Sequence, residues 1–219
     1  MRTPPILTLA LLCAGLAFTS AAPAHATPGA ARFVRLDAFW ARVNQRSVRT
    51  GSDLAGESEL VPMPGWRNTL GVGWRRPSGW GLGLELGLAD RGGRTEETTV
   101  FRPDGSGTQL EFRCRYLDVG LSLGWRKSVG SSFLELSAFP RASFRMEHPW
   151  WMGQYPYFPV VAGLDPTLKL GHAFWHVTGR YQWDLTPSWS HDSRPQPEVT
   201  HVVVHDSGFS LGLGVELPF

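Results

Sequence analysis

The alternation of apolar and polar positions is clearest over residues 209–219. Every second residue there is apolar, and the residues between them are small, polar or turn-forming. The apolar positions are Phe209, Leu211, Leu213, Val215, Leu217 and Phe219. Because successive side chains of a strand point to opposite faces, the segment has one continuous apolar face. A tilted transmembrane β-strand needs about 9–11 residues, so the pattern predicts a strand that crosses a membrane.

Seven earlier stretches show a similar alternation and are predicted as strands. They are residues 32–43, 66–75, 80–89, 110–125, 131–146, 160–170 and 174–185. The first is the weakest, since a helix could hold the same pattern. In the fourth, the apolar parity shifts between Tyr116 and Leu117. That shift indicates either a β-bulge or a strand that protrudes beyond the membrane.

The predicted connections alternate strictly between long and short. Long polar segments cover residues 44–65, 90–109, 147–159 and 186–206, whereas residues 76–79, 126–130 and 171–173 form short turns. Bacterial outer-membrane barrels have an even number of strands, long outer loops and short periplasmic turns. A soluble sandwich gives no reason for such an alternation. The sequence therefore predicts an all-β fold, an eight-stranded antiparallel up-and-down transmembrane β-barrel.

Composition agrees with a barrel. The chain has 25 Gly, 10 Trp and 12 Phe, yet its mean hydropathy is only −0.16, as expected when half of each strand faces a polar interior. Aromatic residues gather near both sets of connections, which predicts two interfacial girdles. Those near the short turns are Trp74, Trp80, Trp125, Phe133, Trp175 and Phe219, and those near the long loops are Trp40, Trp66, Trp150, Trp151 and Phe209.

The first 26 residues are predicted to be a secretory signal peptide, which leaves residues 27–219 as the barrel domain. Arg2 precedes an apolar run over residues 6–17, and Ala24-His25-Ala26 is a small-x-small cleavage site. The mature chain then keeps only Cys114, so no intramolecular disulfide can form. The formal net charge of +2 and the scattered arginines give no nucleic-acid footprint.

Charged residues on the polar faces of the strands are candidates for a network in the barrel interior, the lumen. The predicted members are Arg75, Glu85, Asp118, Glu135, Arg141, Arg145, Asp165, Lys169, Arg180, Asp184 and Glu216. An eight-stranded barrel is just wide enough for its side chains to fill, and buried charges must pair. A packed ionic plug is therefore favoured over a pore. Glu85, Asp118, Glu135 and Arg141 come from three adjacent strands and are predicted to interact.

Catalytic and metal-binding motifs are weak. His191-Asp192-Ser193 and His205-Asp206-Ser207 contain the residue types of a hydrolase, but neighbouring residues of a strand point to opposite faces. The His-x-Ser-Asn run of outer-membrane lipid A deacylases is also missing. His172 with His176, or His191, His201 and His205, match no closed zinc spacing. We therefore expect no catalytic residue, cofactor or metal.

The loop over residues 148–158 is dense in aromatic residues and is the best candidate for contact with an extracellular partner. Trp150, Trp151, Tyr155 and Tyr157 are its candidate contact residues. The alternative is that these side chains extend the outer girdle or fold over the barrel mouth.

Two segments resemble the PorT-like outer-membrane barrel family. Leu82-Gly83-Leu84-Glu85-Leu86-Gly87, followed by Asp90-Arg91-Gly92-Gly93, is similar to a strand of that family and its trailing glycines. Tyr116 to Leu123 resembles the next strand, although Val119-Gly120 departs from the usual Ile-Pro step. The resemblance covers residues 66–146 and the last strand and implies an eight-stranded outer-membrane barrel without a general catalytic motif. The chain's aromatic carboxy-terminal residue is also common among such barrels.

These features together predict a monomer, exported to the bacterial outer membrane, with a structural, adhesive or assembly-related role. Its expected partners are outer-membrane lipid and an extracellular ligand or envelope protein bound through the long loops. A lipid-modifying, deacylase-like enzyme is the first alternative. A soluble lipocalin-like carrier is the second, but its apolar residues would face inward.

Overall fold

Eight long strands form the body of the protein. The computed structural model describes residues 31–50, 56–94, 100–101, 107–108, 111–146, 160–187, 189–191 and 201–219. The long strands are β1 (Ala31–Thr50), β3 (Pro64–Arg75), β4 (Trp80–Arg94), β7 (Glu111–Val129), β8 (Ser132–Arg145), β9 (Val160–His172), β10 (Trp175–Asp184) and β12 (His201–Pro218). Four short strands accompany them: β2 (Gly56–Pro62), β5 (Val100–Phe101), β6 (Gly107–Thr108) and β11 (Trp189–His191). The predicted signal peptide, residues 1–26, lies outside the described residues.

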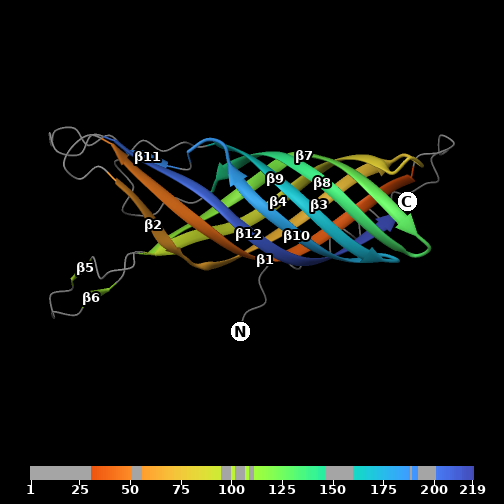
Figure 1. Cartoon of the computed structure of the whole chain (residues 1–219), viewed down its shortest axis with the longest axis horizontal. Coiled ribbons are helices and arrows are strands. Elements are labelled where there is room, and N and C mark those ends of the chain that lie inside the picture. The colour runs from red at the N-terminus through yellow and green to blue at the C-terminus, as the bar shows by residue number, and fades with distance from the viewer. Residues whose placement is uncertain are drawn as a thin grey trace.

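The eight long strands close into an antiparallel barrel (Figure 1). Each pairs with its neighbours in chain order, and β12 pairs with β1 in a register that runs from Phe33 opposite Pro218 to Thr50 opposite His201. Closure removes the free edges that an open sheet would expose. The predicted eight-stranded barrel is thus confirmed, and residues 32–43 belong to a strand rather than a helix.

The three short turns lie at one end of the barrel, beside the carboxy-terminus. In the first turn, the Gly79 N–H donates to the Arg76 carbonyl (2.9 Å), and the Gly79 carbonyl accepts from the Arg126 N–H (3.0 Å). Gly79 has φ of +91°, and a Cβ atom there would lie 2.2 Å from the Arg126 carbonyl oxygen. Only glycine fits this position, which fastens the β3–β4 turn to β7.

Several strands extend further than their apolar patterns predicted. β1 reaches Thr50 and β2 covers Gly56–Pro62, both within the predicted loop 44–65. β4 continues to Arg94, β12 begins at His201, and β7 runs to Val129 through the predicted turn 126–130. Backbone hydrogen bonds hold a ladder together without apolar side chains. The apolar pattern therefore marks the membrane-height part of a strand and not its ends.

The parity shift in β7 is not a bulge. β4 and β7 stay in one continuous register from Trp80 opposite Trp125 to Arg94 opposite Glu111. Cys114 and Tyr116 face the interior, where they cluster with Val161. The parity shifts because Cys114 and Tyr116 occupy inward positions beside buried charged residues such as Arg91.

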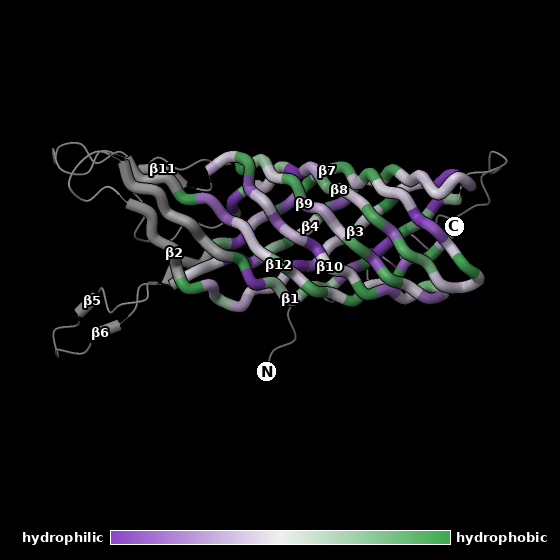
Figure 2. Tube along the Cα trace, viewed as in Figure 1, coloured by the Kyte–Doolittle hydropathy of each residue, from purple (hydrophilic) through white to green (hydrophobic). Residues whose placement is uncertain are grey.

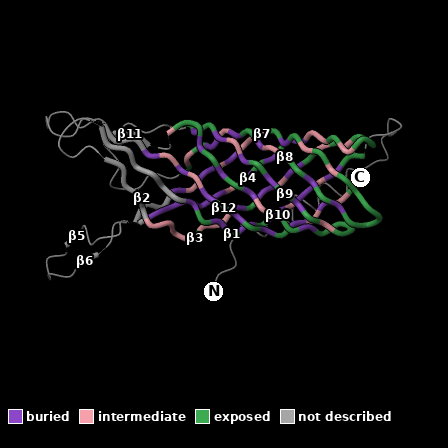
Figure 3. The backbone as a smooth tube through the Cα atoms, viewed as in Figure 1, coloured by how far each residue is buried: buried purple, intermediate pink, exposed green. Residues whose placement is uncertain are grey.

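The two faces of the barrel wall differ in polarity. Buried and exposed residues alternate along the strands (Figure 3), and hydrophilic and hydrophobic residues alternate with them (Figure 2). Outward side chains include Trp80, Leu213 and Trp175, which are 54%, 64% and 58% exposed, whereas most buried charged residues point inward. No helix long and apolar enough to cross a membrane occurs among the described residues.

The girdle prediction needs one correction. Trp74, Trp125 and Phe219 are exposed at the short-turn end, as are Trp80 and Trp175. Phe133 is only 8% exposed and lies inside the barrel, because it has the parity of the inward-facing Glu135. Trp150 and Trp151 lie outside the described residues.

Candidate functional site

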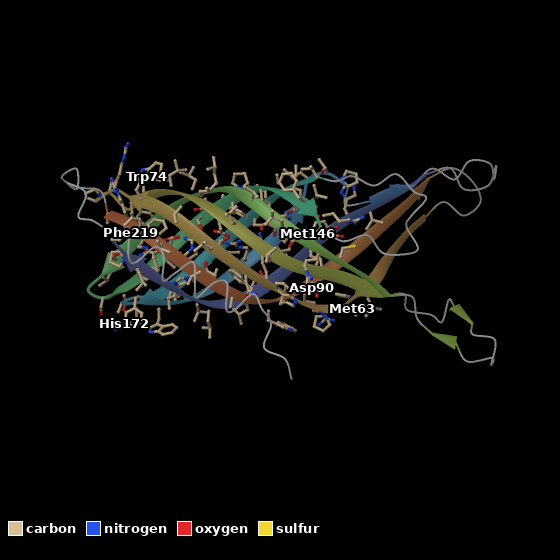
Figure 4. All side chains as sticks on the ribbon, turned by 180° about the vertical axis from the view of Figure 1, so that it is seen from behind. Met63, Trp74, Asp90, Met146, His172 and Phe219 are labelled. Atoms are coloured by element: carbon tan, nitrogen blue, oxygen red, sulfur yellow. The ribbon has the colours of Figure 1, made fainter. Side chains whose placement is uncertain are left out.

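The candidate site is the ion-pair network that fills the lumen. All eleven residues of the predicted network lie in long strands and on their inward face. Nine of them are buried, and Arg75 and Arg145 are partly buried. Figure 4 shows the described side chains, with Trp74, His172 and Phe219 labelled at the short-turn end and Met63, Asp90 and Met146 towards the long loops.

Asp118 and Asp165 anchor the part of the network nearest the long loops. Arg67 contacts both, with its Nη2 2.9 Å from Asp118 and its Nη1 2.6 Å from Asp165. Arg91 donates to Asp118 (2.7 Å), and Arg141 donates to Asp165 (2.9 Å) and also pairs with Asp184. Each carboxylate thus meets at least one guanidinium, as buried charge requires.

Glu85 is the centre of the middle part. It is fully buried and lies between two arginines, with Nη2 of Arg35 and Nη1 of Arg180 each 2.6 Å from a carboxylate oxygen. The Arg35 Nε is also 3.1 Å from Asp37, whose other oxygen is 2.6 Å from Nε2 of His176. One carboxylate on β4 therefore connects charges on β1 and β10.

Glu135 and Glu216 form the part nearest the short turns. Arg75 donates to Glu135 (2.9 Å) and to Glu216 (2.8 Å). Arg126 binds the same two carboxylates at 2.7 and 2.8 Å. Lys169 donates to Glu135 at 3.1 Å and is itself fully buried. Two arginines shared by two glutamates close this end of the lumen.

The ion pairs join opposite walls as well as neighbouring strands. In the barrel order β12-β1-β3-β4-β7-β8-β9-β10, strand β3 lies opposite β9 and β4 lies opposite β10. The Arg67–Asp165 ion pair joins β3 to β9, and the Arg180–Glu85 ion pair joins β10 to β4. These contacts cross the centre of the lumen.

Inward aromatic rings separate layers of the network. The Arg67 and Arg180 guanidinium carbons lie 5.7 and 5.1 Å from the centroid of Phe139. Arg126 stacks on Phe133 at 3.7 Å, and Arg91 lies 4.4 Å from Tyr116. The rings fill the space between ion pairs and add cation–π attraction to the arginines.

Two glycines make room for charged groups. A Cβ atom at Gly163 would lie 2.5 Å from Cζ of Arg141. One at Gly214 would lie 2.3 Å from an Asp37 oxygen and 2.4 Å from Nε2 of His176. A larger residue at either site would push against an ion pair, so these positions need a residue without a side chain.

The predicted cluster of Glu85, Asp118, Glu135 and Arg141 splits between parts of the network. Ser143 bridges Arg141 and Asp118, donating to Asp118 at 2.5 Å and accepting from Arg141. Arg35 bridges Glu85 and Glu135, at 2.6 and 3.7 Å. Three of the four are acids, which repel one another, so the connections between them pass through cations from other strands.

Several network residues escaped the sequence prediction. Arg35, Asp37 and Arg67 share the inward parity of their strands, a signal that was available. Arg91 and Arg126 lie beyond the predicted strand ends, in segments interpreted as a loop and a turn. His176 also has the inward parity of Arg180. Underestimated strand lengths therefore account for Arg91 and Arg126, whereas the other four lie inside predicted strands and follow from parity.

The described members of the hydrolase candidates on β12 do not converge. His205 and Asp206 lie on opposite faces of β12, and Asp206 is fully buried. Asp192 and Ser193 lie outside the described residues. At an exposed turn, Nδ1 of His172 is 3.0 Å from the Ser132 hydroxyl. Within the described ranges, no group of three or more His, Cys, Asp or Glu side chains could hold a metal ion.

The comparisons with known proteins support the fold. The structure of outer membrane protein OprG from Pseudomonas aeruginosa matches with a TM-score of 0.56 and 9% identity, over 86% of this chain and 96% of that one. The fold is that of an outer-membrane β-barrel protein. Outer membrane protein AlkL (TM-score 0.46, 13% identity, 90% and 94% covered) and Neisserial surface protein A (0.40, 14%, 85% and 98%) were also found.

No protein-family model and no curated relative matches the sequence. The resemblance to PorT-like barrels is therefore not confirmed, and the solved structures support only the broader class of eight-stranded barrels.

Proposed function

We propose that the protein is an integral outer-membrane barrel with a closed lumen, which serves as a rigid anchor for its long outer connections. The outward face supports membrane insertion. Leu121, Leu211 and Leu213 are each more than half exposed, although large apolar side chains in water are costly. A bilayer removes that cost, and apolar outward faces with polar interiors are the rule for such barrels.

The observation that carries the proposal is the set of ion pairs across the lumen. Arg67–Asp165 and Glu85–Arg180 connect opposite walls, and all four side chains are almost completely buried. A barrel of eight strands has an interior that side chains can fill. The charges therefore act as a plug and not as the lining of a porin-like channel.

The two alternatives fit the structure less well. A soluble lipocalin-like carrier has an apolar interior, whereas this interior holds Arg35, Glu85 and Lys169. An enzyme needs a base within reach of a nucleophile and of its substrate. The Asp37–His176 pair is buried among other charges, and the exposed His172 ring contacts the hydroxyls of Ser131 and Ser132 without a carboxylate from the described residues. These observations favour a non-enzymatic role.

Two measurements test the proposal. The protein should fractionate with the outer membrane and migrate faster in gels before boiling than after it. Reconstituted in planar bilayers, it should give no porin-like conductance steps. A detergent-independent soluble protein would refute membrane insertion, and steady large conductance would refute the closed lumen.

The anchoring role also predicts a partner for the long connections, either an extracellular ligand or an envelope protein. Trp150, Trp151, Tyr155 and Tyr157, the expected contacts, lie outside the described residues. Their contribution remains a prediction from the sequence.

A further inference from the structure

A groove of about 920 Å³ lies on the outer wall of the barrel. It crosses from Trp80 on β4 through Trp125, Leu136 and Leu168 to Phe209 on β12. Its residues follow the hydrogen-bonding direction, since Trp80 pairs with Trp125, Trp125 with Leu136, and Leu136 with Leu168. The groove therefore runs across the strands and not along one of them.

Small outward residues make this part of the wall hollow. Ala138 and Pro166 are partners across β8 and β9, and Gly179 pairs with Leu168 on the next strand. Most other strands carry leucine, valine or tryptophan at outward positions of the same height. The missing side-chain volume on β8, β9 and β10 forms the floor, with Trp125 and Tyr181 among the residues around it.

The part of the groove nearest the short turns suits one lipid leaflet. Five strand spacings separate β4 from β12, about 24 Å at roughly 4.8 Å each. Strands that tilt by about 40° make this path rise by roughly 15 Å, half of a hydrocarbon core of about 30 Å. The path begins at Trp80, directly after the first short turn, and ends at Phe209, ten residues before the carboxy-terminus. The hydrogen-bonded row that starts at Trp80 reaches Leu211 on β12, and Phe209 lies two residues further towards the long loops. The part of the groove between Trp80 and Leu168 therefore lies in the periplasmic half of the wall.

Basic side chains lie at the periplasmic end of the groove. Arg76 and Lys127 are exposed, and each lies two residues beyond an outward tryptophan on the same face, Trp74 and Trp125 respectively. The backbone N–H of Arg76 donates to the Trp80 carbonyl (2.8 Å), and the Gly79–Arg126 hydrogen bond holds this turn against β7. Both cations are therefore positioned beside the tryptophans where the groove starts.

The exposed charged side chains described at this end are basic. The corresponding outward residues of β8 and β9 are Ser132 and His172. Among the described residues near the short turns, the acidic side chains are Glu135 and Glu216, which are buried inside and bound to Arg75 and Arg126. No exposed carboxylate side chain in this described region neutralises Arg76 or Lys127.

We propose that this surface binds an anionic phospholipid of the periplasmic leaflet. Arg76 and Lys127 contact the phosphate-bearing headgroup, and one acyl chain lies in the groove. The proposal depends on the proposed insertion in a membrane. Basic side chains at one end and an apolar groove that rises from that end select a ligand with an anionic headgroup and an acyl chain over a free anion or an uncharged alkane.

The test is a lipid titration of the detergent-solubilised barrel, followed by native mass spectrometry. Phosphatidylglycerol and phosphatidylcholine with identical oleoyl chains are the probes. The wild-type protein should retain phosphatidylglycerol preferentially. In the Arg76→Gln/Lys127→Gln double variant, the dissociation constant for phosphatidylglycerol should rise about 25-fold, about five-fold for each cation. Arg42→Gln removes an exposed arginine that pairs with Phe209, far from the short turns, and is the control for loss of a cation outside the headgroup site. It should leave the preference for phosphatidylglycerol unchanged.

A second pair of variants tests the groove. Ala138→Phe fills it and should weaken binding of the long-chain lipid several-fold, whereas Ala38→Phe, at an outward alanine on β1, should not. Millimolar inorganic phosphate should not displace the lipid. Equal retention of both lipids, or unchanged binding by the double variant, would overturn the headgroup site, and unchanged binding by Ala138→Phe would overturn the acyl groove. Heat-modifiable migration of membrane fractions tests insertion separately, so its failure is distinguishable from failure of the lipid site.

Discussion

At the residue scale, the interior is organised by shared partners. In the described part of the lumen, most carboxylates contact more than one cation, and Glu135 by itself contacts Arg35, Arg75, Arg126 and Lys169. Loss of one member therefore leaves several groups without full compensation. Removing one partner of a buried pair is far more damaging than replacing the whole pair by apolar groups.

Glu85→Leu tests the plug directly. The substitution leaves Arg35 and Arg180 without the carboxylate oxygens that each contacts at 2.6 Å. We expect a loss of about 3–5 kcal/mol in unfolding free energy, seen as a lower melting temperature in detergent, with little change in conductance. Leu84→Met, at the adjacent outward position, is the control and should leave both quantities unchanged. A large new conductance would mean that the charges block a permeation path.

Gly163→Ala tests the packing around Arg141. The new methyl group would lie 2.5 Å from the Arg141 guanidinium carbon and would push it from Asp165 and Asp184. We expect a destabilisation of about 1–3 kcal/mol by urea unfolding. At Gly71 the nearest atom to a Cβ would be an Arg35 nitrogen at 3.5 Å, an ordinary contact. Gly71→Ala should therefore cost much less, and an equal cost at both sites would contradict this interpretation.

The lumen residues could be predicted from parity, but their partners could not. Strand alternation assigns Asp165 to the interior, while its pairing with Arg67 joins residues 98 positions apart. That contact depends on the tilt and stagger of the strands, which no local pattern contains. Phe133 shows the opposite error, since its aromatic character favoured a girdle position although its parity matches Glu135.

At the element scale, the alternation of apolar residues located each of the eight long strands of the barrel wall. It underestimated the length of several of them. β1 and β12 stay paired beyond Val43 and Gly208, where the apolar pattern has ended. Polar residues continue a ladder because its hydrogen bonds are made by the backbone. Predicted loops therefore shorten at both ends, while the order of long and short connections is unaffected.

The aromatic loop between β8 and β9 carries the prediction of an extracellular contact. Replacing Trp150 and Trp151 with Ser should leave folding in detergent unchanged and reduce surface adhesion or ligand binding. The reason is that clusters of exposed aromatic side chains often form binding surfaces. Heat-modifiable migration measures folding, and whole-cell adhesion measures the contact. Trp175→Ser, an outward substitution at the opposite end, is a control for general loss of tryptophan. Unchanged adhesion would leave the aromatic residues with a structural role only.

At the scale of the whole molecule, the strict alternation of long and short connections predicts the up-and-down topology without any knowledge of side-chain contacts. An even number of strands with alternating connections places all short turns at one end, and the structure has them there beside Phe219. Closure by β12 and β1 follows once the first and last strands are neighbours. The groove on the wall could not be predicted in this way, because it results from Ala138, Pro166 and Gly179 meeting across three strands.

In a bilayer, the free-energy cost of a charged side chain on the outward face depends on how deep in the membrane that side chain lies. Leu213 is 64% exposed and lies midway along the apolar face of residues 209–219, whereas Leu217 lies near its end. Arginine at the midplane of a membrane barrel costs about 2–4 kcal/mol, and near the interface about 0–1. Leu213→Arg should therefore reduce the stability of the barrel folded in lipid vesicles by the larger amount and Leu217→Arg by the smaller. In a soluble barrel an outward arginine would be tolerated at both positions, so equal and small effects would contradict membrane insertion, and a graded loss would support it.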